Sequence, residues 1–176
     1  MKYKIIQLLT LSIIIFIISI FFIGLNKSSI YDTKNLEGQV LKDIKLDHFS
    51  ENRLILDKDF KKNNFTLINF WASWCGPCLL EHPFLLKLNA EKNLKIFGVN
   101  FKDKKNNALS FLDKNGNPYD DLAKDEFGKY SVSFGIYGIP ESILINKNLV
   151  ILKKFIGPLS NNDYNYIVNV LKTNEN

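Results

Sequence analysis

The chain has 176 residues, of which 46% are hydrophobic and 13% aromatic, so it is neither disordered throughout nor too small for a packed core. Its net charge of +5 comes from 23 Lys and Arg against 18 Asp and Glu, and Arg53 is the sole arginine. Nucleic-acid recognition favours bidentate arginine or a clustered basic stripe, so these scattered lysines argue against a nucleic-acid partner. The 2 cysteines cannot staple a whole fold, which leaves redox chemistry or metal binding as their purpose.

Residues 1–25 are predicted to be a membrane anchor. Lys2 and Lys4 precede an uncharged apolar run over residues 5–25, which as a helix would be about 30 Å long and would cross a bilayer. A cleaved signal peptide is the alternative, but the run is longer than a usual signal core and no clear small-x-small pair follows it. The two lysines favour a cytoplasmic amino terminus, which places the rest of the chain on the outer, oxidising side of the membrane.

Residues 26–38 are polar and have no sustained period, which is typical of a tether. Residues 39–176 have the right size for one domain with a single core. In this domain, residues 44–47 and 53–56 are expected to pair as an edge hairpin. The apolar run at residues 65–71 predicts a buried strand that leads through a turn into a helix.

The second half of the domain continues the alternation of strands and helices. A buried strand is expected at residues 94–101 and a short helix at 107–113. Residues 141–145 and 149–155 flank an Asn-Lys-Asn turn and predict a hairpin. Ser160 could cap a final helix over 161–171. These elements indicate an α/β fold with a central mixed sheet flanked by helices.

Residues 74–78 read Trp-Cys-Gly-Pro-Cys at the start of the predicted helix. Amide N–H groups and the positive helix end favour a thiolate at Cys75, which makes it the candidate nucleophile. Cys78, one turn further on, could attack a mixed disulfide at Cys75 and release the reduced partner. Glu81 shares a helix face with Cys78, and as a partly buried carboxylate it could accept and return the proton of Cys78. A solvated surface glutamate is the alternative.

A metal site is the main rival to redox chemistry. His82 follows Cys78 by four residues, but structural zinc needs four ligands, and His48 is the only other histidine. We therefore expect His82 to be an ordinary residue of the helix surface and no metal to be bound. Two thiolates can hold Cu(I) without a third ligand, so a copper carrier stays open as an alternative.

Two further segments could contact a substrate. Trp74 is expected to form a lip beside Cys75. Residues 135–141 read Gly-Ile-Tyr-Gly-Ile-Pro-Glu, immediately before an apolar strand. A proline at the mouth of a strand can be cis, which would expose the backbone of Ile139 to an extended peptide. An ordinary trans Pro140 in a loop is the alternative.

Taken together, residues 69–78, Asn-Phe-Trp-Ala-Ser-Trp-Cys-Gly-Pro-Cys, and the downstream Ile-Pro pair resemble the thioredoxin superfamily. The resemblance implies a thioredoxin-like fold in which Pro140 is cis and faces Cys75. It also places Asn69 where thioredoxin has a buried aspartate, with Glu81 as the natural substitute. An asparagine at this position, a glutamate after the second cysteine and an N-terminal anchor are similar to the membrane-tethered, extracytoplasmic branch of the superfamily.

Three more segments resemble the DsbE/CcmG family, the thiol:disulfide interchange proteins of cytochrome c maturation. They are residues 98–103, 116–119 and 135–141, which read Gly-Val-Asn-Phe-Lys-Asp, Gly-Asn-Pro-Tyr and Gly-Ile-Tyr-Gly-Ile-Pro-Glu. The family keeps the Cys-x-x-Cys-His haem sites of apocytochrome c as thiols. By resemblance, the site consists of an attacking and a resolving cysteine, two acidic residues near them, and three substrate-binding residues: Cys75, Cys78, Glu81, Glu141, Trp74, Ile139 and Pro140.

The resemblance implies a single-pass protein of a bacterial inner membrane whose soluble domain faces the periplasm. Its partners would be apocytochrome c, or a thiol protein of cytochrome maturation, and a transmembrane electron donor of the DsbD or CcdA kind. No cofactor is implied beyond the Cys75–Cys78 disulfide. The Gly-Pro dipeptide favours a reducing potential, roughly that of thioredoxin near −270 mV. Many relatives carry Pro-Thr there, so a broader extracytoplasmic disulfide reductase is the second alternative, beside the Cu(I) metallochaperone.

Overall fold

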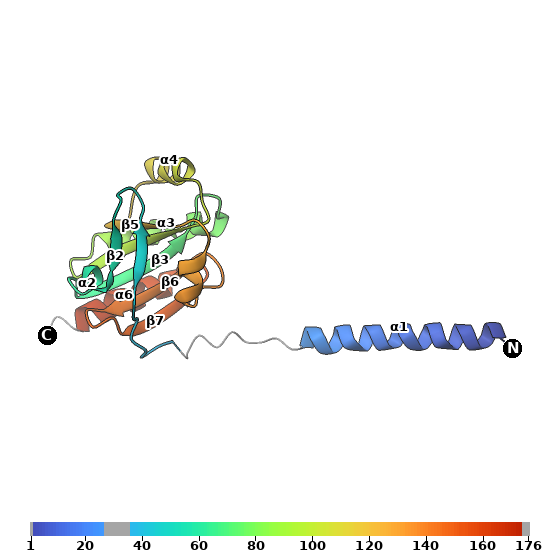
Figure 1. Ribbon diagram of the computed structural model, residues 1–176. Coiled ribbons are helices and arrows are strands. Elements are labelled where there is room, and N and C mark those ends of the chain that lie inside the picture. Colours follow the sequence, from blue (N-terminus) through green and yellow to red (C-terminus); the bar gives the residue numbers. More distant parts are fainter. Residues whose placement is uncertain (1, 27–35, 174–176) are drawn as a thin grey trace. The chain divides into compact units, whose positions relative to one another are not determined.

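The computed structural model describes residues 2–26 and 36–173, which form two separate units: an N-terminal helix and a domain built on one sheet (Figure 1). The helix is α1, Lys2–Asn26, and it is long and apolar enough between Lys2 and Ile23 to cross a membrane. Most of the predicted tether, 26–38, lies outside the described residues. Where the description resumes, the Gly38 N–H donates to the Ile151 carbonyl at 2.8 Å, so the chain has already joined the domain there.

The domain is organised around a mixed sheet with the strand order β2-β1-β5-β4-β3-β6-β7. Its strands are β1 Lys45–His48, β2 Leu54–Leu56, β3 Phe65–Trp71, β4 Leu94–Phe101, β5 Asp121–Asp125, β6 Glu141–Asn146 and β7 Ile151–Ile156. β3, β4 and β5 run parallel, and β6, β7, β1 and β2 join by antiparallel pairing. The carboxyl ends of β3 and β4 therefore meet at one edge of the sheet, where their loops build the site.

Both faces of the sheet are covered. The remaining helices are α2 Asp57–Phe60, α3 Gly76–Asn89, α4 Lys105–Asn115, α5 Lys129–Ser133 and α6 Asn161–Thr173. Leu85 of α3 and Ile167 of α6 share one apolar cluster with Leu67 of β3, and this cluster contains both cysteines. Phe60 of α2 and Ile68 of β3 belong to the cluster on the other face. The site thus lies over the α3 side of the sheet, with α4 at one end of the domain (Figure 1).

Most predicted elements are confirmed with small shifts. The strands at 65–71 and 94–101 have the predicted bounds, and the predicted edge hairpin is β1–β2. Ser160 caps α6 as expected, because its hydroxyl accepts from the Asp163 N–H at 3.3 Å. The strand predicted at 149–155 begins two residues late, because Leu149 adopts a φ of 62° in the preceding turn.

Three elements were not predicted. The strand β5 contains two aspartates and only two apolar residues, so its own sequence does not favour a strand. It forms because β1 and β4 supply hydrogen-bonding edges on both sides. The helices α2 and α5 have 4 and 5 residues, which is too short for a recognisable apolar period.

A pair of leucine variants tests the packing of α3. Leu85 is 1% exposed in the core beneath the site, and Leu80, on the same helix, is 70% exposed. We expect L85A to lower the free energy of unfolding by about 2 to 5 kcal/mol, because it leaves a cavity. L80A should change it by less than about 0.5 kcal/mol. Urea unfolding followed by tryptophan fluorescence measures both, and equal losses would contradict the described orientation of α3.

Candidate active site

The turn that leads into the cysteine pair is fixed by an aspartate from the next loop. Asp103, after β4, accepts hydrogen bonds from the N–H of Ser73 at 2.6 Å and from its hydroxyl at 2.9 Å. Asn100 at the end of β4 donates its side-chain amide to Asp103 at 3.1 Å. The loops after two parallel strands are thereby tied together. Asp103 ends the segment 98–103 that resembles the family, but its local sequence does not indicate the contact with Ser73.

Cys75 and Cys78 are joined by a disulfide at the start of α3. Cys75 is the N-cap residue, and its sulfur accepts the N–H of Cys78 at 3.2 Å. The same N–H group and the positive helix end stabilise negative charge on the Cys75 sulfur, which supports Cys75 as the thiolate after reduction. Both cysteines are buried, at 5% and 3% exposure, so a partner reaches Cys75 only by close docking.

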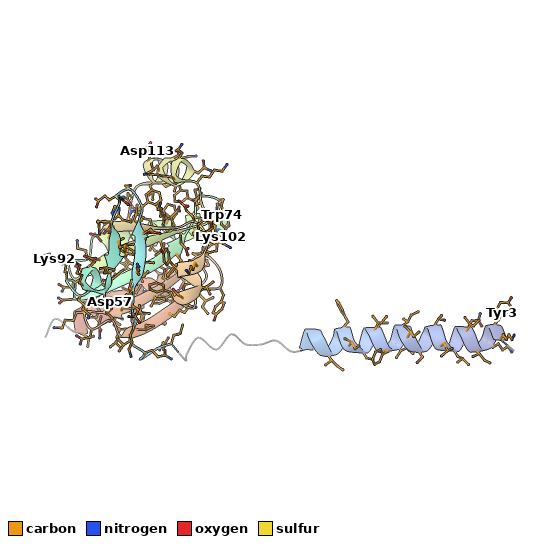
Figure 2. All side chains as sticks on the ribbon, in the orientation of Figure 1. Tyr3, Asp57, Trp74, Lys92, Lys102 and Asp113 are labelled. Atoms are coloured by element: carbon orange, nitrogen blue, oxygen red, sulfur yellow. A yellow bond between two sulfur atoms is a disulfide. The ribbon has the colours of Figure 1, made fainter. Side chains whose placement is uncertain are left out.

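A shallow groove of about 550 Å³ runs between α3 and α4 beside Cys75. Trp74 forms part of the rim of this groove. The indole N–H of Trp74 donates to the Lys102 carbonyl at 3.1 Å, and Figure 2 shows the two residues next to each other. Trp74 is 57% exposed, so much of its ring is available for contact. The residues lining the groove are Ser73, Trp74, Cys75, Gly76, Leu79, Asn107, Ser110, Phe111, Lys114 and Asn115.

Glu81 is completely buried, on the face of α3 that also carries Cys78. The Asn69 side-chain amide donates to its Oε1 at 2.8 Å, and the Leu159 N–H donates to its Oε2 at 2.9 Å. Asn69 is held in turn, because it donates to the Ser142 hydroxyl at 2.9 Å and accepts the Tyr119 hydroxyl at 2.8 Å. The alternative of a solvated surface glutamate is therefore wrong.

The environment of Glu81 raises the pKa of its carboxyl group into the neutral range. Burial raises the pKa of Glu81 to about 7, and the hydrogen bonds from Leu159 and Asn69 oppose this shift only in part. Burial also raises the pKa of Tyr119 well above its ordinary value, with a smaller contribution from the charge of Glu81. Tyr119 therefore stays a protonated donor to Asn69, whereas Glu81 can exist in either form near pH 7.

The expectation that His82 lies on the helix surface is wrong. His82 is 3% exposed, because α4 and the turn after it cover this side of α3. Its Nε2 lies 2.9 Å from the Gly116 carbonyl, which can only accept, so Nε2 carries the hydrogen. The imidazole also packs edge-on against Phe111 of α4, with ring centroids 5.2 Å apart. His82 thus links α3 to the end of the helix that forms the other wall of the groove.

The structure separates the two predicted acidic residues. In the pairing of β3 with β6, Asn69 lies opposite Ser142 and Phe70 lies opposite Glu141. Because side chains alternate along a strand, Ser142 faces the Glu81 side of the sheet and Glu141 faces the other side. There Glu141 Oε2 lies 2.7 Å from the ammonium nitrogen of Lys154.

The residue before Pro140 lies at the end of the sheet from which α3 begins, because Glu141 at the start of β6 pairs with Phe70 near the end of β3. The Ile139–Pro140 peptide bond is cis, as the resemblance implied. Ile139 packs against the apolar cluster that contains Cys75 and Cys78. The structure thus brings the loop before β6 to the same end of the domain as the start of α3.

The two histidines make contacts in separate parts of the domain. His48 accepts the N–H groups of Ser50 and Glu51 at its Nδ1, and its Nε2 lies 2.9 Å from Asp121. Within residues 2–26 and 36–173, no group of three or more His, Cys, Asp or Glu side chains is arranged to hold a metal ion.

Comparisons with known proteins agree with this geometry. A family model described as Redoxin matches residues 36–171. The thiol:disulfide interchange protein CycY of Rhizobium leguminosarum is 46% identical over 100 residues, which span 57% of this chain and 54% of CycY, about half of that relative. HelX of Rhodobacter capsulatus is 35% identical over 125 residues, or 71% of this chain and 70% of HelX. DsbE of Vibrio cholerae is 33% identical over 129 residues, or 73% of this chain and 70% of DsbE.

Solved structures confirm the predicted fold class. The crystal structure of a putative thiol:disulfide interchange protein DsbE from Chlorobium tepidum superposes with a TM-score of 0.64 at 26% identity. The superposed region covers 77% of this chain and 96% of the Chlorobium tepidum chain. The solution structure of a putative thioredoxin from Neisseria meningitidis gives a TM-score of 0.66 at 22% identity, covering 78% of this chain and 92% of that protein, which supports the fold alone. The domain is thioredoxin-like, with a central mixed sheet flanked by helices.

The raised pKa of Glu81 predicts how stability depends on pH. The ordinary pKa is 4.5 and the folded value about 7, so between these pH values the folded chain keeps a proton that the unfolded chain has lost. The stability from the protonated carboxyl is fully present below about pH 4.5 and is lost as the pH rises to about 7. We expect this loss to be about 3 kcal/mol in the wild-type chain.

The matched variants are E81Q and E126Q, because Glu126 is a surface residue with 58% side-chain exposure. E81Q should remove this part of the pH dependence, and E126Q should keep the wild-type slope. Urea unfolding of the oxidised chain across this pH range gives the free energies. A wild-type slope in E81Q would show that the carboxyl group does not titrate in this window.

Proposed function

The chain belongs to the redoxin family and, within it, to the DsbE/CcmG thiol:disulfide interchange proteins, and from this we propose that it reduces the disulfides of Cys-x-x-Cys-His haem sites in apocytochrome c. Its activity is that of a thiol:disulfide oxidoreductase. One observation carries the reductase mechanism: a carboxyl group with a pKa near 7 is buried on the same face of α3 as Cys78. Such a group can take up the proton of the resolving thiol inside the protein.

The proposed reaction begins with the reduced cysteine pair. The Cys75 thiolate attacks one sulfur of the substrate disulfide, that disulfide breaks, and the released substrate thiolate takes a proton from water. Cys78 then passes its thiol proton to Glu81 and attacks the Cys75 sulfur. The mixed disulfide breaks, and the second substrate sulfur leaves as a thiolate that takes up a proton as Glu81 gives up its own and returns to the carboxylate form. Two electrons have moved to the substrate, and the chain holds the Cys75–Cys78 disulfide seen in the structure.

Trp74, Ile139 and Pro140 are proposed to hold the substrate. The support is that Trp74 is exposed on the rim of the groove beside Cys75, and that Ile139 packs against the cluster containing the cysteines. An extended segment of apocytochrome c could then lie across the start of α3, with its backbone against the loop before Pro140. Close docking is needed because Cys75 itself is only 5% exposed.

Each turnover leaves the pair oxidised, so the chain needs a source of electrons. We propose a transmembrane donor of the DsbD or CcdA kind, with the domain in the periplasm and residues 5–25 in the inner membrane. The length and apolar character of α1 support this placement. The reduced, dithiol form of the cysteine pair carries both electrons, so the proposed reaction needs no bound organic cofactor or metal.

Cysteine variants of the full chain test the reaction. With a peptide that contains one disulfide in a Cys-x-x-Cys-His sequence, reduced C78S should accumulate a mixed disulfide, because nothing resolves the bond at Cys75. C75S should form almost none, because Cys75 lines the groove and Cys78 is not among its lining residues. Mass spectrometry of quenched mixtures identifies the adducts, and equal trapping by the two variants would contradict the assigned order of attack.

A comparison of substrates separates the alternatives. The wild-type chain should reduce the Cys-x-x-Cys-His peptide faster than a peptide of the same composition whose cysteines are five residues apart. Equal rates would indicate a broader disulfide reductase. Tight, stoichiometric Cu(I) binding without any dithiol exchange would indicate a copper carrier.

A further inference from the structure

Glu141 and Lys154 form a buried ion pair on the sheet face opposite Glu81. Glu141 Oε2 lies 2.7 Å from Lys154 Nζ, and the two side chains are 5% and 1% exposed. In the pairing of β6 with β7, Glu141 lies opposite Ile156 and Ile143 lies opposite Lys154. Glu141 and Lys154 are therefore diagonal neighbours on one face, which is the spacing at which long side chains meet.

A buried ion pair needs a reason, because two apolar residues would fill the same place without the cost of desolvating two charges. Here both members of the pair also bind the loop that leads to Pro140. Lys154 Nζ donates to the Gly135 carbonyl at 2.6 Å. Glu141 Oε1 accepts the N–H of Gly138 at 3.2 Å and that of Tyr137 at 3.4 Å. Three backbone groups of residues 135–138 are thus held by one pair of charges.

The Tyr137 side chain completes the arrangement. Lys154 Nζ lies 5.3 Å from the centre of its ring, which is within the range of a cation–π contact. Tyr137 is 63% exposed, so its ring also offers an aromatic surface at the loop. Residues 135–138 are thus held by the hydrogen bonds to Glu141 and Lys154 and by this cation–π contact.

We propose that Lys154 and Glu141 are positioning residues for substrate docking, which hold residues 135–139 so that the backbone of Ile139 meets an extended substrate segment. This inference rests on the proposed function and deepens it. Glu141 acts on substrate affinity through the loop, and proton transfer belongs to Glu81 on the opposite face. The ligand class is an extended peptide containing a disulfide, recognised through its backbone.

The test uses the full-length reduced chain in detergent, mixed in single-turnover experiments with the disulfide form of a Cys-x-x-Cys-His peptide. Hydroxyethyl disulfide, which has no peptide backbone, serves as the second oxidant. K154M alone leaves Glu141 charged and unpaired in the core, which can unfold the domain. The double variant E141Q/K154M removes both charges and carries the test if K154M does not fold. K154R keeps the cation.

K153M is the matched control. Lys153 is the neighbour of Lys154 on β7, and its ammonium nitrogen lies 4.0 Å from the centre of the Tyr166 ring, away from the loop. K153M therefore removes a lysine from the same strand without touching residues 135–139. It should leave the reactions with both oxidants at wild-type rates.

We expect the peptide concentration for half-maximal rate to rise about tenfold in E141Q/K154M, the equivalent of about 1.4 kcal/mol of lost docking. The limiting rate, the reaction with hydroxyethyl disulfide and the pH at which the Cys75 thiolate forms should stay near wild type. K154R, which keeps the positive charge, should retain most of the wild-type affinity for the peptide.

Two results would overturn the positioning role. One is an unchanged peptide dependence in the folded double variant. The other is a shift of the Cys75 thiolate profile or of the limiting rate, which would make Glu141 part of the proton chemistry. A wild-type chain that the peptide does not oxidise would instead contradict the proposed function, so the two failures can be told apart.

Discussion

The burial of one carboxyl group constrains much of the domain. Glu81 has no solvent contact, and a buried carboxylate is costly unless hydrogen-bond donors surround it. One donor comes from Asn69 on β3 and the other from the Leu159 backbone after β7. Asn69 can serve Glu81 only because Ser142 and Tyr119 fix its amide group from two more segments. Four parts of the chain must therefore be correctly placed before the hydrogen bonds around Glu81 can form.

Both carboxylate oxygens of Glu81 accept hydrogen bonds, but from donors that carry no positive charge. Within the described residues, hydrogen bonds to Glu81 come from neutral groups, and desolvation prevails over them, which is why the pKa rises. An arginine or lysine in their place would hold the carboxylate charged and remove its value as a proton acceptor. The substitution of Asn69 for the aspartate typical of thioredoxin fits the same requirement, because two adjacent buried acids would compete for one proton.

The two faces of the sheet divide the proposed work. The α3 face holds the cysteines, Glu81 and its donors, where bonds are made and protons move. The opposite face holds Glu141 and Lys154, which reach the loop before Pro140 through its backbone. Alternation along β6 places Ser142 and Glu141, adjacent in sequence, on the two sides. One strand therefore links the proposed redox chemistry to the proposed substrate docking.

Local sequence predicted the parts of this fold that depend on continuous apolar runs. The strands Phe65–Trp71 and Leu94–Phe101 are buried along almost their whole length, so their bounds follow from composition. The strand Asp121–Asp125 could not be predicted, because its neighbours rather than its residues make it a strand. The cis bond before Pro140 was expected only through family resemblance, since the local pattern left a trans bond open.

The arrangement of the site could be predicted where it follows from the start of a helix, as for Cys75, Cys78 and Glu81. It was missed where burial depends on distant segments. His82 is covered by α4, which no local pattern reveals. Lys154 looks like a surface lysine in an amphipathic strand, and its partner is visible only once β6 and β7 are paired. The role of Asp103 is also invisible in the local sequence, because its partner Ser73 lies in another loop.

The reduction potential of the Cys75–Cys78 pair tests the central claim most directly. Equilibration of the full-length chain in defined thiol/disulfide buffers gives this value, with the change in tryptophan fluorescence or alkylation as readout. A reductase of this kind should have a potential near or below about −200 mV. A potential near about −120 mV, as in a strong oxidant of the DsbA kind, would contradict the assignment and indicate disulfide formation instead.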